Sequence, residues 1–455
     1  MSSVSSSLKK ALPPLRSSAK QCCPVRRLVN VAGLLPKRGV PSYTLCMTIR
    51  MDSLIKAIAT ALDAVEHDLL GASTNHGKRI AVLSAGMGKV LGKSPEEVMG
   101  VAMCALLHDN ALTEYLLAEK VSGHHDPTMK KHCEYGQRNV DALCFNTNVS
   151  NFILYHHERA DGKGPFGVCS GEGPVEAELI AIADSLDVHY HLQEVKDEDL
   201  PSLKEAVSRQ SGKRYSKTAV DALLAVLDEP MLHSLGNQEI GETADSAFVP
   251  WIVDMEADAM FGLAGFVSKI IDYKSTFTQR HSAQAANKAW LMGGYYQYDR
   301  LERTKLYVAA ALHDIGKLKT PTEILEKSGK LTHDEFIVIK DHIRHTWEIL
   351  KDIEGFEPMC EWASNHHEKL DGSGYPFGKT KDALDFNSRL MACIDIYQAV
   401  SEKRPYHPAR SHEDTMNVLQ KMADSGDIDK DIVNDISLAL APYDGKDLPP
   451  PETDA

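Results

Sequence analysis

The second half of this chain repeats the first. The segment ALLHDNA at 105–111 returns as ALHDIGK at 311–317, and YHHERADGKGPFG at 155–167 returns as NHHEKLDGSGYPFG at 365–378. Isolated His and Asp residues around these segments keep the same register, with separations of 205 to 211 residues. A nearly constant separation over several anchors indicates two copies of one structural unit. We therefore predict two tandem domains of one fold, divided near 240–250 in the polar stretch GNQEIGETADS.

Each copy has the apolar spacing of helices. Apolar residues recur at intervals of three and four in DSLIKAIATALDAV and VDALLAVLDE, which is the period of an amphipathic helix. Thr332 and Glu335 have the spacing of a capping box, which opens a helix. Alternating apolar and polar runs, the signal of strands, are scarce. We predict an all-α fold of two helical bundles, at 51–240 and 250–445, with a short tail at 446–455.

The composition is that of a soluble globular protein. Of the 455 residues, 43% are hydrophobic and 25% are charged. No uncharged apolar run approaches the roughly 18 residues that a membrane-spanning helix needs. The net charge of −14 argues against a nucleic-acid polymer as partner. Nine Cys are scattered without a CxxC pair, which indicates reduced thiols and a cytoplasmic location. We expect no membrane partner, and the oligomeric state is left open.

Residues 1–50 differ from the rest of the chain. They hold nine Lys or Arg and no acidic residue, and they are rich in Ser. This composition is typical of an organellar transit peptide. We favour two other interpretations, a disordered basic leader or an upstream start codon with Met47 or Met51 as the true beginning. In either case, we expect folding to begin near Met51.

The second copy carries seven residues that can bind metal ions: His281, His313, Asp314, His342, His366, His367 and Asp395. One ion needs fewer ligands, whereas two ions roughly 3.5–4 Å apart with a bridging carboxylate suit such a set and hydrolyse phosphoesters. A single His is more often a hydrogen-bonded core or surface residue than a ligand. The first copy nevertheless keeps the same seven residue types at matching positions, so the set as a whole indicates metal: His76, His108, Asp109, His132, His156, His157 and Asp184.

The second copy resembles the HD-GYP phosphodiesterases, a branch of the HD-domain metal-dependent phosphohydrolases. The resemblance lies in HDIGK at 313–317, HHEKLDGSGYP at 366–376 and EKRPY at 402–406, and it covers roughly residues 265–440. It implies an all-helical domain that hydrolyses a bacterial cyclic dinucleotide, most often cyclic di-GMP. It also implies a centre of two or three iron or manganese ions.

The resemblance implies a role for each matching residue. One ion would be held by His281, His313, Asp314 and Asp395, and Asp314 would bridge to a second ion held by His342, His366 and His367. The catalytic pair would be Asp314 and Lys317, with Lys317 on the phosphate. The remaining substrate contacts would come from Arg404 and from the loop residues Gly374, Tyr375 and Pro376. Two simpler interpretations compete: Lys317 can stabilise a helix C-terminus, and Arg404 can form a surface salt bridge.

Two departures from the family pattern change these expectations. Trinuclear members are similar in having a Glu four residues before the first His, where this chain has Phe277. Because Phe cannot bind a metal, we predict two ions; ligand type alone would also admit zinc, cobalt or nickel. In the first copy, Leu112 stands at the position of Lys317, and GYP has become Gly164-Pro165-Phe166. We expect this copy to bind metal in a regulatory or scaffolding role.

Three functions stay open. The first is a phosphodiesterase for a cyclic dinucleotide, with cyclic di-GMP as the first candidate. The second is another HD-type phosphohydrolase acting on a nucleotide, including cyclic GMP-AMP. The third is a non-catalytic sensor of metal or nucleotide. The intact HDIGK and GYP motifs of the second copy favour an enzyme, because a sensor has no need of a phosphate-binding Lys beside the metal ligands.

Overall fold

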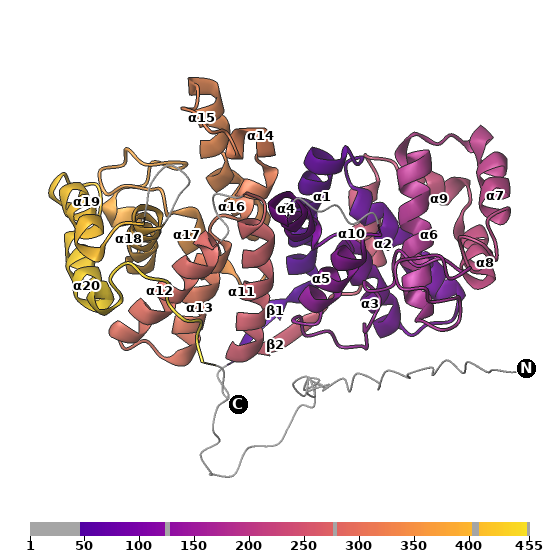
Figure 1. Ribbon diagram of the computed structural model, residues 1–455, viewed down its shortest axis with the longest axis horizontal. Coiled ribbons are helices and arrows are strands. Elements are labelled where there is room, and N and C mark those ends of the chain that lie inside the picture. Colours follow the sequence, from indigo (N-terminus) through magenta and orange to yellow (C-terminus); the bar gives the residue numbers. More distant parts are fainter. Residues whose placement is uncertain (1–45, 123–127, 276–279, 403–408, 453–455) are drawn as a thin grey trace, which may run out of the picture.

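The computed structural model describes residues 46–122, 128–275, 280–402 and 409–452. These residues are mostly helical, with two short strands, so the predicted all-α class is confirmed. Figure 1 shows the two halves side by side, the first in indigo to magenta and the second in orange to yellow. Within the described part of the chain, no helix has the length and apolar character needed to span a membrane.

The described residues of the first half form helices α1 (Met51–Leu70), α2 (His76–Val90), α3 (Pro95–Leu106), α4 (Leu112–Ser122), α5 (Lys130–Val140), α6 (Val175–Tyr190), α7 (Leu200–Ser208), α8 (Lys217–Val226), α9 (Glu229–Ser234) and α10 (Ile240–Ala247). Those of the second half form α11 (Ala257–Asp272), α12 (His281–Tyr295), α13 (Arg300–Leu312), α14 (Thr322–Leu325), α15 (His333–Lys340), α16 (His342–Leu350), α17 (Glu357–Ser364), α18 (Phe386–Ser401), α19 (His412–Asp424) and α20 (Lys430–Leu440). Short 3₁₀ turns are η1 (Leu192–Glu194), η2 (Asp197–Asp199), η3 (Ile315–Lys319), η4 (Lys381–Ala383) and η5 (Ala441–Tyr443).

Side-chain caps fix several helix starts. The predicted capping box is confirmed, since Thr332 accepts a hydrogen bond from the Glu335 backbone N–H and Glu335 accepts one from that of Thr332. Helix α3 begins in the same way, with Ser94 and Glu97. Because the first N–H groups of a helix have no partner within it, such boxes stop the helix from starting earlier. Helices α3 and α15 thus begin at residues that the sequence defines.

Two strands join the halves and were not predicted. Strand β1 (Cys46–Arg50) pairs antiparallel with β2 (Ile252–Glu256), and Thr48 lies opposite Asp254. In β1 the buried residues are Met47 and Ile49. Two alternating apolar residues are too short a pattern to identify a strand from sequence. The described structure begins with β1, directly before Met51, near which the sequence predicts the start of the fold.

The strand pairing defines a pseudo-two-fold relation between the copies. Thr48 Oγ donates to Asp254 Oδ1, and these residues are 206 positions apart. Lys274 Nζ donates to Asp68 Oδ2 at 2.7 Å across the same separation. A two-fold axis brings equivalent positions of the two copies together. Identical residues at these positions would carry the same charge, so an ion pair between them requires that the two copies differ. The two halves have become complementary at this contact.

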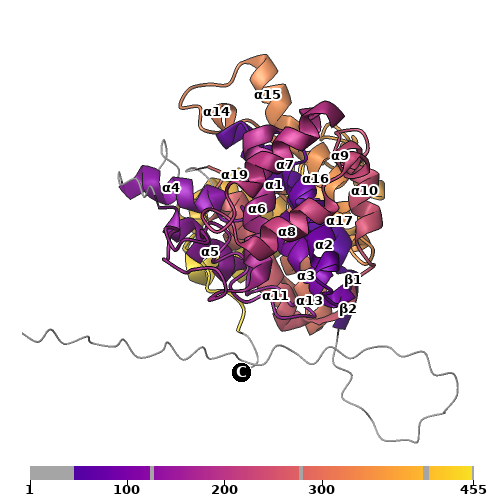
Figure 2. The same cartoon turned by 90° about the vertical axis from the view of Figure 1, so that its right-hand side faces the viewer.

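Helix α1 connects the halves. It contacts α2 and α3 of its own half and η3 and α16 of the other, and Figure 2 shows α1 beside α16 from a second direction. The turn η3 directly follows the HD motif of the second copy. The first helix of the chain therefore supports the segment that carries Lys317.

The stretches expected as boundary and tail contain packed structure. The polar stretch near 240–250 includes α10, where Ile240 and Ala244 are buried and the helix packs on α2. The second copy starts with β2, the counterpart of β1. Near the C-terminus, Leu448 is buried, and its carbonyl accepts hydrogen bonds from Gln284 and Asn287 of α12. Both stretches look like linkers because only their few apolar residues face the core.

Candidate metal centres and active site

Helix ends bring the predicted ligands of the second half together. His281 and His342 are the first residues of α12 and α16, and His313 directly follows α13. The chain after α17 supplies His366 and His367, and α18 supplies Asp395. All of these side chains and that of Asp314 are buried, except that of His367, which is 30% exposed. Rigid helices thus converge on one interior point.

Two groups of ligand atoms meet at Asp314. His281, His313 and Asp395 form one group, and His342, His366 and His367 form the other, with the ligand atoms of each group within 4.8 Å of one another. Asp314 lies between the groups. Its Oδ2 is 3.3 Å from His313 Nε2, and its Oδ1 is 3.3 Å from His342 Nε2. One carboxylate therefore offers an oxygen to each group, as a bridging ligand does.

Buried atoms without partners support a metal at this point. Among the described residues, the Nε2 atoms of His313, His342 and His366 are fully buried with no hydrogen-bond partner, as is Asp314 Oδ1. Orphaned polar atoms are costly in a protein interior. Their positions and the imidazole-carboxylate donor set fit divalent transition-metal ions.

Backbone carbonyls orient most of these imidazoles. Nδ1 of His313, His342 and His366 lies 2.7, 2.5 and 2.6 Å from the carbonyl oxygen three residues earlier. A carbonyl can only accept, so Nδ1 carries the proton and Nε2 presents its lone pair to the centre. These bonds could not be found in the sequence, because any residue supplies a carbonyl.

His281 is oriented differently, by a carboxylate that the sequence did not indicate. Its Nδ1 lies 3.0 Å from Glu402 Oε2, and Gln398 Nε2 donates to the same oxygen at 3.0 Å. Lys288 Nζ in turn donates to Gln398 Oε1 at 2.6 Å. Such carboxylate–imidazole pairs are the usual outer support of a metal ligand.

The predicted contact Arg404 and the replaced position Phe277 lie outside the described residues.

Without metal, the carboxylates of the site raise the pKa of two of its imidazoles. Burial lowers the pKa of His281, but its hydrogen bonds to two carboxylates outweigh burial and raise the pKa to about 9. Burial also opposes protonation of His313, and the charge of Asp314 overcomes it and raises the pKa to about 10. Burial lowers the pKa of His367 to about 4. Metal ions would displace the two extra protons, because a ligating imidazole must be neutral.

Lys317 lies against the carboxylate of Asp314. Its Nζ donates to Asp314 Oδ2 at 2.5 Å from the turn η3. This turn can approach α16 only because residue 316 is Gly, since a Cβ there would lie 1.9 Å from the carbonyl oxygen of His342 and 2.6 Å from the backbone nitrogen of Thr346. The G of HDIGK is thus a packing requirement, and it brings the Lys to the site.

The GYP loop is fastened by the Glu of the HHE motif. The carboxylate of Glu368 accepts from the backbone N–H groups of Phe377 and Lys379 at 2.7 and 2.9 Å. The ring of Tyr375, between Gly374 and Pro376, lies 5.0 Å from that of His367. Glu368 was missed, although the sequence held a signal, since the Glu recurs after both HH pairs.

The first half gathers its seven counterparts in the same way. Asp109, His132, His156 and His157 form one group with ligand atoms within 4.8 Å of one another, and His76, His108 and Asp184 form another. The position of Lys317 is taken by Leu112, which is buried. The loop differs as well. Glu158 accepts from the backbone N–H groups of Phe166 and Val168, which correspond to Phe377 and Lys379 of the second half. With the loops aligned on these contacts, no residue of the first half corresponds to Tyr375.

A buried ion pair orients His76. Its Nδ1 lies 2.6 Å from Asp187 Oδ2, and Arg79 binds the same carboxylate with Nε at 2.7 Å and Nη2 at 3.0 Å. The Arg79 side chain is fully buried. The two copies therefore support the same ligand with unrelated residues, Asp187 and Arg79 in the first and Glu402 in the second.

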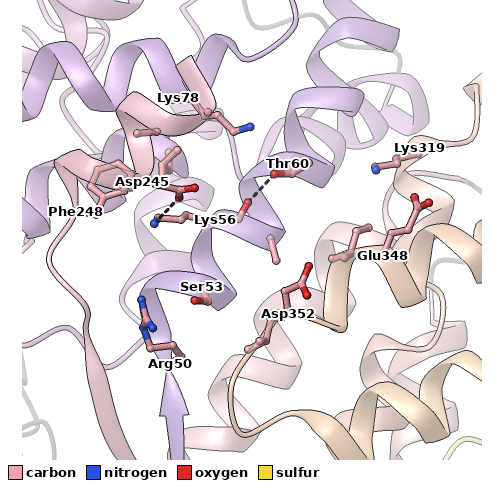
Figure 3. Close-up of a pocket in the computed structure, with 16 residues that line it drawn as sticks. Arg50, Ser53, Lys56, Thr60, Lys78, Asp245, Phe248, Lys319, Glu348 and Asp352 are labelled. Carbon is pink, nitrogen blue, oxygen red and sulfur yellow. Dashed lines mark hydrogen bonds and ion pairs between the residues drawn. The ribbon is translucent and has the colours of Figure 1, made fainter. Parts of the chain in front are cut away.

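A groove between the halves is separate from both clusters. Figure 3 shows Lys56 and Asp245 paired on one wall, and Lys319, Glu348 and Asp352 on the other. None of its lining residues belongs to the two ligand sets. Lys319 thus lies in this groove, two residues after the Lys of the HD motif but away from the cluster.

An HD pair at a helix end, with His residues converging from neighbouring helices, defines the HD-domain class of proteins. Models of the family described as HD domain match residues 265–432 and 74–188. The chain is 30% identical over 393 residues to 3'3'-cGAMP-specific phosphodiesterase 1 of Vibrio cholerae, a match that covers 82% of this chain and 88% of the relative. The chain therefore belongs to the HD-GYP family of phosphodiesterases, whose HD domains are metal-dependent.

Other relatives match in part or in fold. A cyclic di-GMP phosphodiesterase of Vibrio cholerae is 40% identical over 121 residues, which is 25% of each chain. The crystal structure of a cyclic GMP-AMP-specific phosphodiesterase of Vibrio cholerae superposes with a TM-score of 0.58 at 20% identity, covering 87% of this chain and 98% of that chain. This structure shares the tandem fold.

Proposed function

We propose that this chain is a metal-dependent phosphodiesterase for a cyclic dinucleotide, with its active site in the second half. The observation that carries the proposal is the placement of Asp314 between two groups of buried ligand atoms, with Lys317 beside it. A relative matched over 82% of the chain and named a phosphodiesterase supports the same activity.

Two divalent cations fit the ligand set. His281, His313 and Asp395 would hold one, His342, His366 and His367 would hold the other, and Asp314 would bridge them. Iron or manganese is the proposed pair, as the family resemblance implies. Bound cations would supply a Lewis acid that activates water near neutral pH and stabilises charge on phosphoryl oxygens.

The chain's own groups would bind and orient the substrate. Lys317 would exchange its contact with Asp314 for a phosphoryl oxygen, because the bridging carboxylate needs no second cation once metal is bound. Gly374, Tyr375 and Pro376 would cover the site, and the ring of Tyr375, with Lys340 Nζ 4.2 Å from its centroid, offers a surface for a base. Arg404 keeps its proposed phosphate contact.

The preferred substrate is 3'3'-cyclic GMP-AMP, with cyclic di-GMP as the second candidate. Sequence motifs alone put cyclic di-GMP first. The relative matched over most of the chain, both halves included, is named for 3'3'-cGAMP, whereas the cyclic di-GMP enzyme reported above matches only a quarter of the chain. The long match deserves more weight because it includes the first half, where a difference in substrate could arise.

The first half would hold metal without hydrolysing substrate. Leu112 cannot bind a phosphate, and the loop lacks the Tyr of GYP, so a regulatory or scaffolding role suits this copy. The enzyme would work in the cytoplasm; no disulfide joins the cysteines of the described residues, as in a reducing compartment.

Incubation of the purified chain with each cyclic dinucleotide tests the proposal. Metal-free protein is loaded with Mn²⁺ or Fe²⁺, and the products are separated by chromatography. We expect a linear dinucleotide or mononucleotides, formed faster from 3'3'-cyclic GMP-AMP than from cyclic di-GMP. Binding of either nucleotide without any product, with metal present, would identify a sensor and contradict the proposal.

A further inference from the structure

Helix α1 holds a buried carboxylate, that of Glu66, one oxygen of which has no hydrogen-bond partner among the described residues. Glu66 is 3% exposed, and the oxygen in question is Oε2. Burial raises the pKa of Glu66 well above its usual range, and the neighbouring carboxylates of Asp109, Asp63 and Asp184 raise it further, while His76 lowers it. Asp63, one turn earlier in α1, accepts from the backbone N–H of His76 at 2.9 Å, so Glu66 lies near the start of α2, where the first ligand of this cluster stands.

The second half shows what a carboxylate at this position otherwise does. The residue 206 positions later is Asp272, at the end of α11, and it caps α12 by accepting from the backbone N–H groups of Ser282 and Ala283 at 2.9 and 3.2 Å. In the first half, Asp63 performs this task for α2, one turn earlier in α1. Glu66 is therefore released from capping.

The two clusters differ in the positive charge placed beside their carboxylates. Each ligand set has two carboxylates, and in the second half Lys317 donates to one of them. In the first half, Leu112 stands in place of that Lys, so no Lys from this position balances Asp109. Buried carboxylates without cations are costly, and a metal ion would remove that cost in the first half, where the Lys is missing.

We propose that Glu66 is a further ligand of the metal held by the first-half cluster, which makes that cluster a retained metal site rather than a second hydrolytic centre. The inference rests on the proposed metal binding by the first half. Glu66 lies outside the groups whose ligand atoms are within 4.8 Å of one another, so it would close on the ion by rotating its flexible side chain.

The site would also fasten the contact between the halves. Two residues after Glu66, Asp68 accepts from Lys274 Nζ at 2.7 Å and from the Thr322 backbone N–H at 3.0 Å. Thr322 begins α14, directly beyond the turn that carries Lys317. A metal ion on Glu66 would therefore hold this end of α1 against the catalytic half.

The test uses the full chain with Asp314→Ala, which disables the second site. Mn²⁺ binding is measured by equilibrium dialysis with elemental analysis, and melting temperature is measured with and without Mn²⁺. Glu66→Gln should weaken Mn²⁺ binding by at least about tenfold, since even an outer-shell partner contributes that much. The same change should raise the metal-free melting temperature, because it removes a buried ionisable group, and it should reduce the rise caused by Mn²⁺.

Asp63→Asn provides the matched control. It removes a cap rather than a ligand, so it should lower the melting temperature equally with and without Mn²⁺. Unchanged Mn²⁺ binding and an unchanged metal-induced rise in Glu66→Gln would overturn the proposal. Absence of Mn²⁺ binding in the Asp314→Ala parent would overturn it too, while hydrolysis by the unmodified chain would still stand as a separate result.

Discussion

Replacing Lys317 with Leu gives the catalytic half the residue that the first half carries at this position. Lys317 Nζ is 2.5 Å from Asp314 Oδ2, and its side chain is 22% exposed. A hydrogen bond from a charged donor is worth about 1.5–3 kcal/mol. If Lys317 makes that bond to the phosphate in the transition state, its loss lowers kcat/KM by about 10- to 150-fold, at 1.36 kcal/mol per factor of ten.

The assay measures hydrolysis of 3'3'-cyclic GMP-AMP together with the metal content of the same preparation. Lys317→Leu should keep its metal, because removal of the Lys leaves Asp314 free for the ions. Lys319→Leu is the control, since Lys319 lies on the same turn but faces the groove between the halves (Figure 3). An unchanged kcat/KM in Lys317→Leu, or a loss explained wholly by missing metal, would refute the reasoning.

Three further predictions concern the support of the site. Metal-free protein should melt at its highest temperature near the ordinary His pKa of about 6.5. The pKa of His281 is raised to about 9, so the stability that its protonated form contributes is lost as pH rises through that value. The pKa of His367 is lowered to about 4, so the stability that its neutral form contributes is lost as pH falls towards that value. A flat profile from pH 4 to 10 would contradict both shifts. Gly316→Ala should destabilise the protein by at least about 1–3 kcal/mol through overpacking, whereas Gly329→Ala, where nothing lies within 4 Å of the added Cβ, should change the unfolding midpoint little; equal effects would contradict the packing argument. Glu402→Gln should weaken metal binding about 10- to 100-fold, measured by competition with a chelator, and unchanged affinity would remove Glu402 from its orienting role.

The sequence predicted the fold where patterns were long or repeated. The helical class and the capping box at Thr332 followed from periodicity and spacing. The convergence of the His and Asp residues was expected because duplication kept them in register. The five-residue strands β1 and β2 escaped, since each holds two buried apolar residues and derives its structure from a partner about 200 residues away.

The support of the site was largely invisible in the sequence. Carbonyl groups orient His313, His342 and His366, and any residue could supply them. Glu402 opens the EKRPY segment, but it lies 121 residues from His281, and no spacing rule connects two residues so far apart. Only Glu368 could have been found, because the HHE triplet occurs in both copies.

The comparison of Asp314→Ala with Asp109→Ala tests the central claim most directly. Both variants lose the Asp of an HD pair, one in each half, and both are loaded with Mn²⁺ and given the same cyclic dinucleotide. The account predicts that Asp314→Ala abolishes hydrolysis and that Asp109→Ala lowers the rate only in part. Equal losses, or full activity in Asp314→Ala, would contradict a catalytic centre in the second half.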